Sequence, residues 1–250
     1  MRFRPLAGWD AGGVDWDVRL VAETKSTNAD LAAAARDGAR EGTVIVAEHQ
    51  TAGRGRLDRT WEAPRGSGLV MSALMRPPAL DPARWPWIPL MTGLAVASAV
   101  RDLGLAPSVK WPNDVEIDGR KLAGILVERV ETAHGPAAVI GIGLNIAMTV
   151  DQLPVPTATS LHLEGAEATR DDVLGGVLTG LSVHYELLTS DATALRDAYV
   201  SACGTVGRNV TVNLPDGSTL TGPATDVDEH GRLVVDGRPI TAGDVVHVRT

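Results

Sequence analysis

Cysteine is almost absent from this chain, which has 250 residues and a single cysteine, Cys203. One thiol excludes a disulfide framework and a cluster of thiolate metal ligands, and it is typical of proteins kept in a reducing compartment. We therefore expect a cytoplasmic protein in which Cys203 is a small buried apolar residue. The six histidines never fall at the spacing of zinc ligands, so zinc chemistry is not expected either.

Positive charge and long apolar runs are scarce as well. The chain has 23 basic and 31 acidic residues, a net charge of −8, which argues against nucleic acid or an anionic membrane as the main partner. The apolar run Ile88–Val100 has 13 residues, too few to cross about 30 Å of hydrocarbon. Residues 1–10 lack the apolar segment of a secretory signal. These absences predict a soluble protein, and 44% hydrophobic residues suffice for a sizeable core.

Lysine is rare even among the basic residues, because 20 of the 23 are arginine and only Lys25, Lys110 and Lys121 are lysine. A GC-rich coding sequence is enough to explain this preference, so the scarcity is not in itself a sign of function. Lys110 and Lys121 nevertheless lie within one stretch of twelve residues. The segment that contains both lysines is therefore a candidate for chemistry.

The first 202 residues mix the periodicities of strands and helices. Helices are expected to begin at the N-cap cluster Ser26-Thr27-Asn28, where Asp30 would complete a capping box with Thr27, and after Thr169. Two further helices are expected at 88–103 and 192–201. Strands are expected at 16–22, 43–48, 69–75, 109–111, 115–117, 122–130 and 138–146. The sequence thus predicts an α+β domain with a mixed sheet.

The composition changes after Cys203. Short strand patterns at 206–214, 218–227, 232–235 and 244–248 are separated by turns that contain glycine. Turns at this density predict a small all-β unit, either a sandwich or a barrel. We expect two domains, residues 1–202 and 203–250. The second has four basic and six acidic residues, so its composition does not indicate a phosphate-binding surface.

A segment rich in arginine and glycine follows the second expected strand. Between Thr51 and Arg76, five arginines stand against two acidic residues. Glycines let backbone N–H groups approach an anion, and guanidinium groups bind carboxylate or phosphate oxygens in pairs. A solvated loop with weak surface ion pairs has the same composition, and for an isolated Arg-Gly loop that is the more common case. We expect an exposed loop at 50–66.

A lysine at the beginning of an apolar strand is the second notable feature. Lys121 directly precedes the strand pattern at 122–130, and its ammonium must reach water, a partner or the anion of a ligand. In the alternative interpretation, the stem of Lys121 packs on the sheet edge and its charge stays in water. The sequence alone does not favour either of these two interpretations of Lys121.

A third feature, Gly141-Ile142-Gly143-Leu144-Asn145, ends the last strand expected in the first domain. It is not a dinucleotide fingerprint, because Ile146 occupies the place of the third glycine and no helical pattern follows. We expect the glycines to allow a close approach of backbone within the sheet and the Asn145 amide to face a base or ribose. The sequence also lacks a P-loop and a nucleophile elbow.

Five motifs occur in order along the chain. They are Ser26-Thr27-Asn28, the segment 50–56 with Trp61, Lys110-Trp111-Pro112-Asn113-Asp114, the segment 120–128, and 141–145. Together they resemble the biotin protein ligases, which attach biotin to the carrier domains of carboxylases. The resemblance covers nearly the whole chain, since 203–250 is similar to the SH3-like C-terminal β-barrel of that family.

The resemblance implies a catalytic domain similar to class II aminoacyl-tRNA synthetases and a reaction in two steps. The carboxylate of biotin attacks the α-phosphate of Mg·ATP to give biotinyl-5′-AMP, and a lysine amine of the carrier then attacks this mixed anhydride. By motif, the expected biotin-binding residues are Ser26, Thr27, Gln50, Gly53, Arg54, Gly55, Arg56 and Lys121. The residues expected to bind ATP or adenine are Trp61, Asn113 and Asn145.

Physical chemistry supports cations in the catalytic role. A carboxylate must approach a polyphosphate, and a preorganised donor aimed at the developing charge contributes about 3 to 4 kcal/mol. Lys121, Arg54 and Arg56 are the candidates. Magnesium would share the charge of the phosphates with few protein ligands, so no metal-ligating residue is predicted. The arginine-glycine loop is expected to be mobile without ligand and to exclude water when it closes.

Asp114 has two possible roles that the sequence leaves equal. It is a candidate to orient or deprotonate the incoming lysine amine. In the other role it caps the bend at Pro112-Asn113. Both roles remain open at this point.

Two other functions fit these motifs less well. A lipoate or octanoate ligase or transferase shares the fold and the lysine, but the polar ureido ring of biotin suits these motifs better than a dithiolane does. A non-catalytic sensor would not need cations for both a carboxylate and a phosphate.

Because the first motif begins at residue 26, no helix-turn-helix domain and no DNA binding are expected. We expect a monomer or weak homodimer whose partner is a biotin carboxyl carrier domain.

Overall fold

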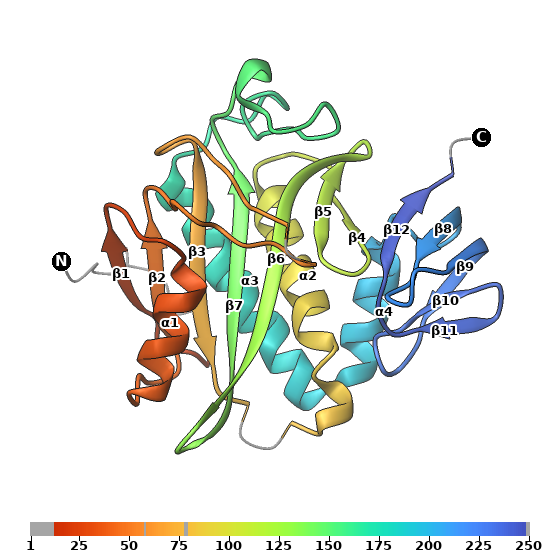
Figure 1. Ribbon diagram of the computed structural model, residues 1–250, viewed down its shortest axis with the longest axis horizontal. Coiled ribbons are helices and arrows are strands. Elements are labelled where there is room, and N and C mark those ends of the chain that lie inside the picture. Colours follow the sequence, from red (N-terminus) through yellow and green to blue (C-terminus); the bar gives the residue numbers. More distant parts are fainter. Residues whose placement is uncertain (1–12, 58, 78–79, 249–250) are drawn as a thin grey trace.

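The computed structural model describes residues 13–57, 59–77 and 80–248. Its larger unit is built on a seven-stranded sheet in the order β1-β2-β3-β7-β6-β5-β4 (Figure 1). β1 and β2 are parallel and the other neighbours are antiparallel, so the sheet is mixed. The strands are β1 (Asp17–Val21), β2 (Thr43–Ala47), β3 (Gly68–Met75), β4 (Ser108–Lys110), β5 (Asp114–Ile117), β6 (Arg120–Thr132) and β7 (Gly135–Asn145).

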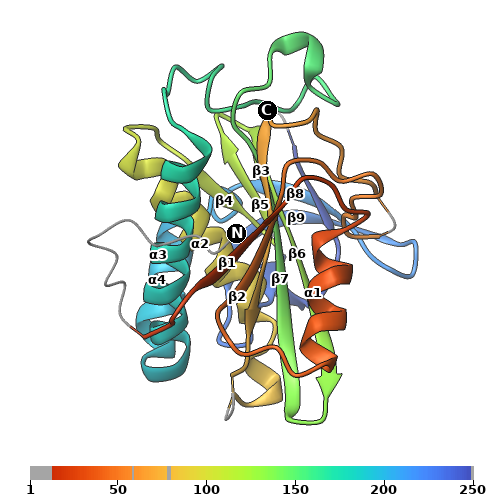
Figure 2. The same cartoon turned by 90° about the vertical axis from the view of Figure 1, so that its left-hand side faces the viewer.

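Helices cover the two faces of this sheet unequally. α1 (Thr27–Arg36) lies on one face, while α2 (Trp87–Asp102) and α3 (Arg170–Ser190) lie on the other (Figure 2). α4 (Ala192–Ala202) follows α3 directly, and two short 3-10 turns cover Pro82–Arg84 and Val150–Gln152. The face that carries α1 is therefore only partly covered by helix, and the cleft described below lies on this face.

The alternation of side chains along β6 and β7 separates a large core from the cleft. Ile140, Ile142 and Leu144 of β7 join the large apolar cluster beneath α2 and α3, whereas Val139 joins the small cluster beneath α1. Between them, Gly141 and neighbouring glycines face the same side as α1. The alternation of side chains thus places large apolar residues on the face beneath α2 and α3 and glycines on the face that carries α1.

The C-terminal unit is an antiparallel sheet in the order β11-β10-β9-β8-β12. Its core joins that of the larger unit, because Val210 and Leu233 belong to the large apolar cluster. Two buried indoles also bridge the units: Trp87 Nε1 donates to Glu229 O at 2.8 Å and Trp111 Nε1 donates to Gly231 O at 3.0 Å. Its strands are β8 (Asn209–Asn213), β9 (Thr219–Val227), β10 (Leu233–Val235), β11 (Arg238–Ile240) and β12 (Asp244–His247).

The expected fold class, a mixed sheet with helices followed by a small β unit, is confirmed. Cys203 is buried, as predicted. Two details were wrong: the strand β11 was not expected, and the capping box of Thr27 and Asp30 does not form. Ser26 is the N-cap of α1, its side chain accepting from Ala29 N.

The predicted domain boundary near residue 203 falls in the connection between α4 and β8, and it stays a prediction. Within the described ranges, no helix combines the length and the apolar character needed to cross a membrane.

Candidate active site

The arginine-glycine segment forms a tight hairpin, whose described residues are 53–57 and 59–61. Trp61 N donates to Gly53 O at 3.0 Å, and Gly55 N donates to Arg59 O at 2.6 Å. A Cβ atom on Gly53 would lie 2.3 Å from the carbonyl oxygen of Trp61, so the hairpin closes only with glycine there. The segment that follows β2 crosses in front of β7 and β6 (Figure 1). The hairpin therefore holds Arg54, Arg56 and Arg59 over the open face of the sheet, and its mobility without ligand stays a prediction.

Glycines in the sheet make room for this hairpin. A Cβ atom on Gly143 would lie 2.2 Å from the ring of Trp61, and one on Gly141 would lie 2.3 Å from Asn28 Oδ1. The indole of Trp61 therefore packs directly on the backbone of β7. Its buried Nε1 has no hydrogen-bond partner among the described residues. The sequence predicted a close approach of backbone at these glycines, and the structure differs: the side chains of Asn28 and Trp61 are what approach them.

One end of the cleft is lined by uncharged polar groups at the beginning of α1. Thr27 N and Oγ1 both donate to Gln50 Oε1, at 2.7 and 2.9 Å. Ser72 Oγ, which is fully buried on β3, lies 2.8 Å from Thr27 Oγ1 and 2.6 Å from Asn28 Oδ1. This network fixes hydroxyl and amide groups in single orientations, which suits a neutral ligand with several donors and acceptors.

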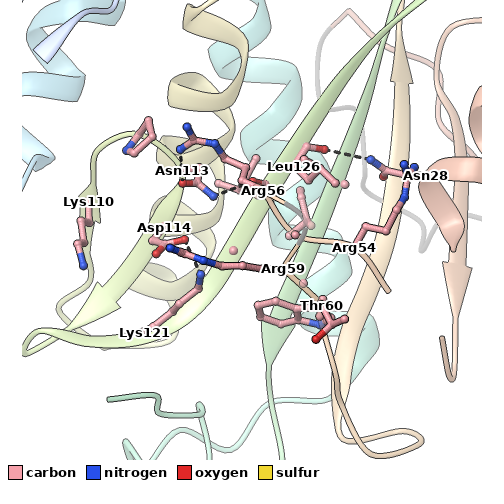
Figure 3. Close-up of a pocket in the computed structure, with 18 of the residues that line it drawn as sticks. Asn28, Arg54, Arg56, Arg59, Thr60, Lys110, Asn113, Asp114, Lys121 and Leu126 are labelled. Atoms are coloured by element: carbon pink, nitrogen blue, oxygen red, sulfur yellow. Dashed lines mark hydrogen bonds and ion pairs between the residues drawn. The ribbon is translucent and has the colours of Figure 1, made fainter. Parts of the chain in front are cut away.

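The other end of the cleft gathers cations. Lys121 Nζ lies 2.7 Å from Asp114 Oδ1 and 5.9 Å from the centre of the Trp61 ring. Arg56 donates to Asn113 Oδ1 at 2.9 Å, a neutral partner (Figure 3). Because the side chain of Arg56 is partly buried, its pKa is lowered, although nearby Asp244 and Asp114 act in the opposite direction. A partly buried cation with a neutral partner is well placed to bind an anion.

Arg54 lies between the two ends. Its guanidinium donates to Glu128 Oε2 at 2.8 Å, and Asn28 Nδ2 donates to the same oxygen at 2.8 Å. In the structure as described, Glu128 thus connects the polar network of α1 to the hairpin. An anionic ligand of Arg54 would have to share this guanidinium with Glu128 or replace it.

A single cavity of about 260 Å³ brings most of the predicted site residues together. The predicted residues that line it are Ser26, Thr27, Gln50, Arg54, Gly55, Arg56, Trp61, Asn113, Asp114 and Lys121. Gly53 lines instead a second cavity, of about 790 Å³, which shares the hairpin as a wall. Asn145 lines neither cavity.

Asn145 is placed differently from what the sequence suggested. Its side chain is 3% exposed, and its Nδ2 donates to Thr159 O at 2.8 Å. The backbone of Lys121 also pairs with this segment, because Lys121 N donates to Thr157 O and Thr159 N donates to Lys121 O, each at 2.8 Å. Asn145 therefore anchors the chain that runs beside Lys121.

Several residues of the cleft were not selected from the sequence. Asn28 belongs to the first motif and Arg59 lies in the arginine-rich segment between Thr51 and Arg76, so a signal for each was present. Ser72 and Asp244 had no local signal, because their roles depend on contacts between distant segments: Ser72 lies buried behind Thr27 and Asn28, and Asp244 lines the cavity from β12. Lys110, which the sequence singled out beside Lys121, also lines the cavity but pairs with the buried Glu116 at 3.0 Å.

These contacts divide the cleft into an uncharged polar end and a cationic end. Fixed hydroxyl and amide groups suit a polar ring, and the cations suit a carboxylate and phosphates. Glycines of β7 and the Trp61 indole also line the cleft. An enzyme that joins a carboxylate to a phosphate needs such a combination of groups.

Comparison with known families agrees with this class. The chain belongs to the biotin/lipoate A/B protein ligase family, whose model matches residues 20–145, and residues 205–248 match the biotin protein ligase C-terminal domain. It is 38% identical to the biotin--[acetyl-CoA-carboxylase] ligase of Mycobacterium tuberculosis, over 98% of this chain and 93% of that protein. The bifunctional ligase/repressor of Bacillus subtilis is 31% identical, over 87% of this chain and 67% of that protein.

The fold is also that of a solved ligase. The biotin protein ligase from Aquifex aeolicus in complex with biotin and ATP superimposes with a TM-score of 0.79 at 26% identity, over 93% of this chain and 99% of that one. The match extends through both units of the chain. The recognised resemblance is therefore confirmed at the level of family and fold.

Proposed function

We propose that the protein is an ATP-dependent biotin protein ligase of the biotin--[acetyl-CoA-carboxylase] ligase type. The observation that carries this proposal is the single cavity in which the Thr27–Gln50 network and the cations Arg56 and Lys121 lie at opposite ends. The relatives support it, because the M. tuberculosis protein carries this name and the A. aeolicus enzyme binds biotin and ATP.

The proposed orientation of biotin follows from the chemistry of the two ends. The ureido ring, which both donates and accepts hydrogen bonds, lies at Ser26, Thr27 and Gln50. Its carboxylate then points along the cleft toward Arg54 and Arg56. The triphosphate of ATP lies at the cationic end beside Lys121, and the free Nε1 of Trp61 can donate to either ligand. Asn113 orients Arg56, and Asn145 acts on the nucleotide through the segment that it anchors.

In the first step, a carboxylate oxygen of biotin forms a bond to the α-phosphorus of ATP, and the bond from this phosphorus to the bridging oxygen breaks. Pyrophosphate leaves with the electron pair. The negative charge that builds on the phosphate oxygens is stabilised by Arg56 and Lys121, which line the same cavity. Asp114 holds the ammonium of Lys121 there.

In the second step, the amine of a lysine on a biotin carboxyl carrier domain attacks the acyl carbon of biotinyl-5′-AMP. The acyl–oxygen bond breaks, AMP leaves, and the nitrogen loses a proton as the amide forms. Asp114 is the carboxylate in the cavity nearest to Lys121 and is our candidate to orient the amine. The ion pair with Lys121 favours this role over capping the bend at Pro112-Asn113.

Magnesium enters as part of the substrate Mg·ATP. Within the described residues no three metal-binding side chains converge, and Mg²⁺ commonly uses one or two carboxylates together with phosphates and water. Asp114 is a carboxylate at the cationic end of the cavity and would be the residue to serve as such a ligand. The metal withdraws charge from the phosphates, and the residues of the cleft bind and orient the two substrates.

The decisive experiment supplies radiolabelled biotin, ATP and an apo carrier domain of acetyl-CoA carboxylase. We expect label on the carrier lysine, in an amount that depends on ATP. Parallel reactions offer lipoate or octanoate with the corresponding carrier. Transfer of these acids without transfer of biotin would assign the protein to the lipoate branch of the family and contradict the proposal.

A further inference from the structure

The C-terminal unit contributes a charged side chain to the cleft. Asp244 is the first residue of β12 and lines the cavity, and its carboxylate forms an ion pair with the guanidinium of Arg59 on the hairpin. Arg59 lines the same cavity. The two residues are separated by 185 positions in the sequence, and the contact joins the C-terminal unit directly to the arginine-glycine hairpin.

The two partners differ in how firmly they are held. Asp244 pairs in register with Asn213 of β8, and the unit that carries it is fixed by the Trp87 and Trp111 bonds described above. Its side chain is 25% exposed. The side chain of Arg59 is 66% exposed and belongs to a hairpin that crosses the face of the sheet. An exposed arginine samples many rotamers unless a partner holds it, so Asp244 is the fixed member that sets the direction of Arg59.

The ion pair with Asp244 leaves most of the N–H donors of Arg59 available to a ligand. One guanidinium nitrogen donates to one carboxylate oxygen of Asp244, while a guanidinium group carries five N–H donors. The other donors can bind a phosphate at the same time.

We propose that Asp244 is a positioning residue of the nucleotide site: it directs Arg59 toward the phosphates of ATP, so that the C-terminal unit completes the site. This inference rests on the proposed function, since it names ATP as the ligand of the cationic end. The composition of the C-terminal unit gave no sign of phosphate binding, because this unit supplies an acid that orients a cation and does not supply the cation itself.

The test measures ATP binding by calorimetry and the KM for ATP in biotin-dependent ATP–pyrophosphate exchange. Asp244→Asn keeps the size of the side chain and removes its charge. We expect the Kd and the KM for ATP to rise roughly fivefold or more, with the affinity for biotin unchanged. Arg59→Ala should give a similar loss, and the double variant should lose little beyond either single variant.

Two controls separate positioning from a general effect on the fold. Asp226→Asn removes another carboxylate of the C-terminal unit, one that pairs with Arg196 of α4 at 2.5 Å, and it should leave the Kd for ATP unchanged. Asp244→Glu keeps the charge and should restore ATP affinity to within about twofold of the wild type. Thermal denaturation of each variant checks that it is folded.

Several results would overturn the inference. An unchanged Kd for ATP in Asp244→Asn would mean that Arg59 needs no partner, and a lower Kd would mean that Asp244 competes with the phosphates for Arg59. An equal loss of biotin affinity would indicate a general disturbance of the cleft. If the wild type binds ATP but shows no biotin-dependent exchange, the proposed function fails, while the calorimetric comparison still tests the role of Asp244.

Discussion

Five cations line the cleft, and four of them are paired with a carboxylate. Arg54 pairs with Glu128, Lys110 with Glu116, Lys121 with Asp114 and Arg59 with Asp244, whereas Arg56 has the neutral amide of Asn113. The ammonium of Lys121 is held by Asp114 inside the cavity, at 35% exposure of its side chain. This geometry disfavours the interpretation of Lys121 as a lysine that merely extends its charge into bulk water.

Replacement of Lys121 by alanine tests this assignment at the level of one residue. We expect Lys121→Ala to lower kcat/KM for adenylate formation by about 100-fold or more, because a preorganised cation is lost where charge develops. Its thermal unfolding temperature should change little. Lys25→Ala, which removes an exposed lysine away from the cavity, is the matched control. Normal adenylation by Lys121→Ala would show that Lys121 has only a structural role.

At the scale of elements, the sequence predicted what local periodicity determines. The strands β1 to β7 and helices α1 to α4 follow from alternation, helical periodicity and capping residues such as Thr169. The hairpin at 53–61 was expected only as a loop, because its closure depends on bonds such as Trp61 N to Gly53 O that no hydrophobic pattern records. β11 was missed because it has three residues, one of them Pro239.

The packing of α2 against α3 makes a prediction about stability. A Cβ atom on Gly180 would lie 2.7 Å from the carbonyl oxygen of Ala95 on α2, so Gly180→Ala must push the helices apart. We expect a loss of about 1 to 3 kcal/mol in the free energy of unfolding, measured by urea denaturation. Thr179→Ala changes an exposed neighbour on the same helix and serves as control. An unchanged or higher stability of Gly180→Ala would show that this contact is not tight.

At the scale of the whole molecule, the net charge of the chain does not describe the charges inside the cleft. The net charge of −8 describes the outer surface, while the hairpin and β6 bring cations together in one small cavity. The sequence identified that hairpin by composition, yet it gave no sign of Asp244, because β12 reaches the cleft only after the C-terminal unit packs on Trp87 and Trp111. The absence of DNA binding, the oligomeric state and the location in the cell stay predictions.

The central claim is that this cleft activates biotin as an adenylate before transfer. The most direct measurement incubates the protein with biotin and ATP labelled at the α-phosphate, without a carrier, and identifies the labelled product that stays bound. We expect biotinyl-5′-AMP, which disappears with release of AMP when an apo carrier domain is added. A bound adenylate that forms with lipoate or octanoate but not with biotin, or no adenylate with any of the three acids, would contradict it.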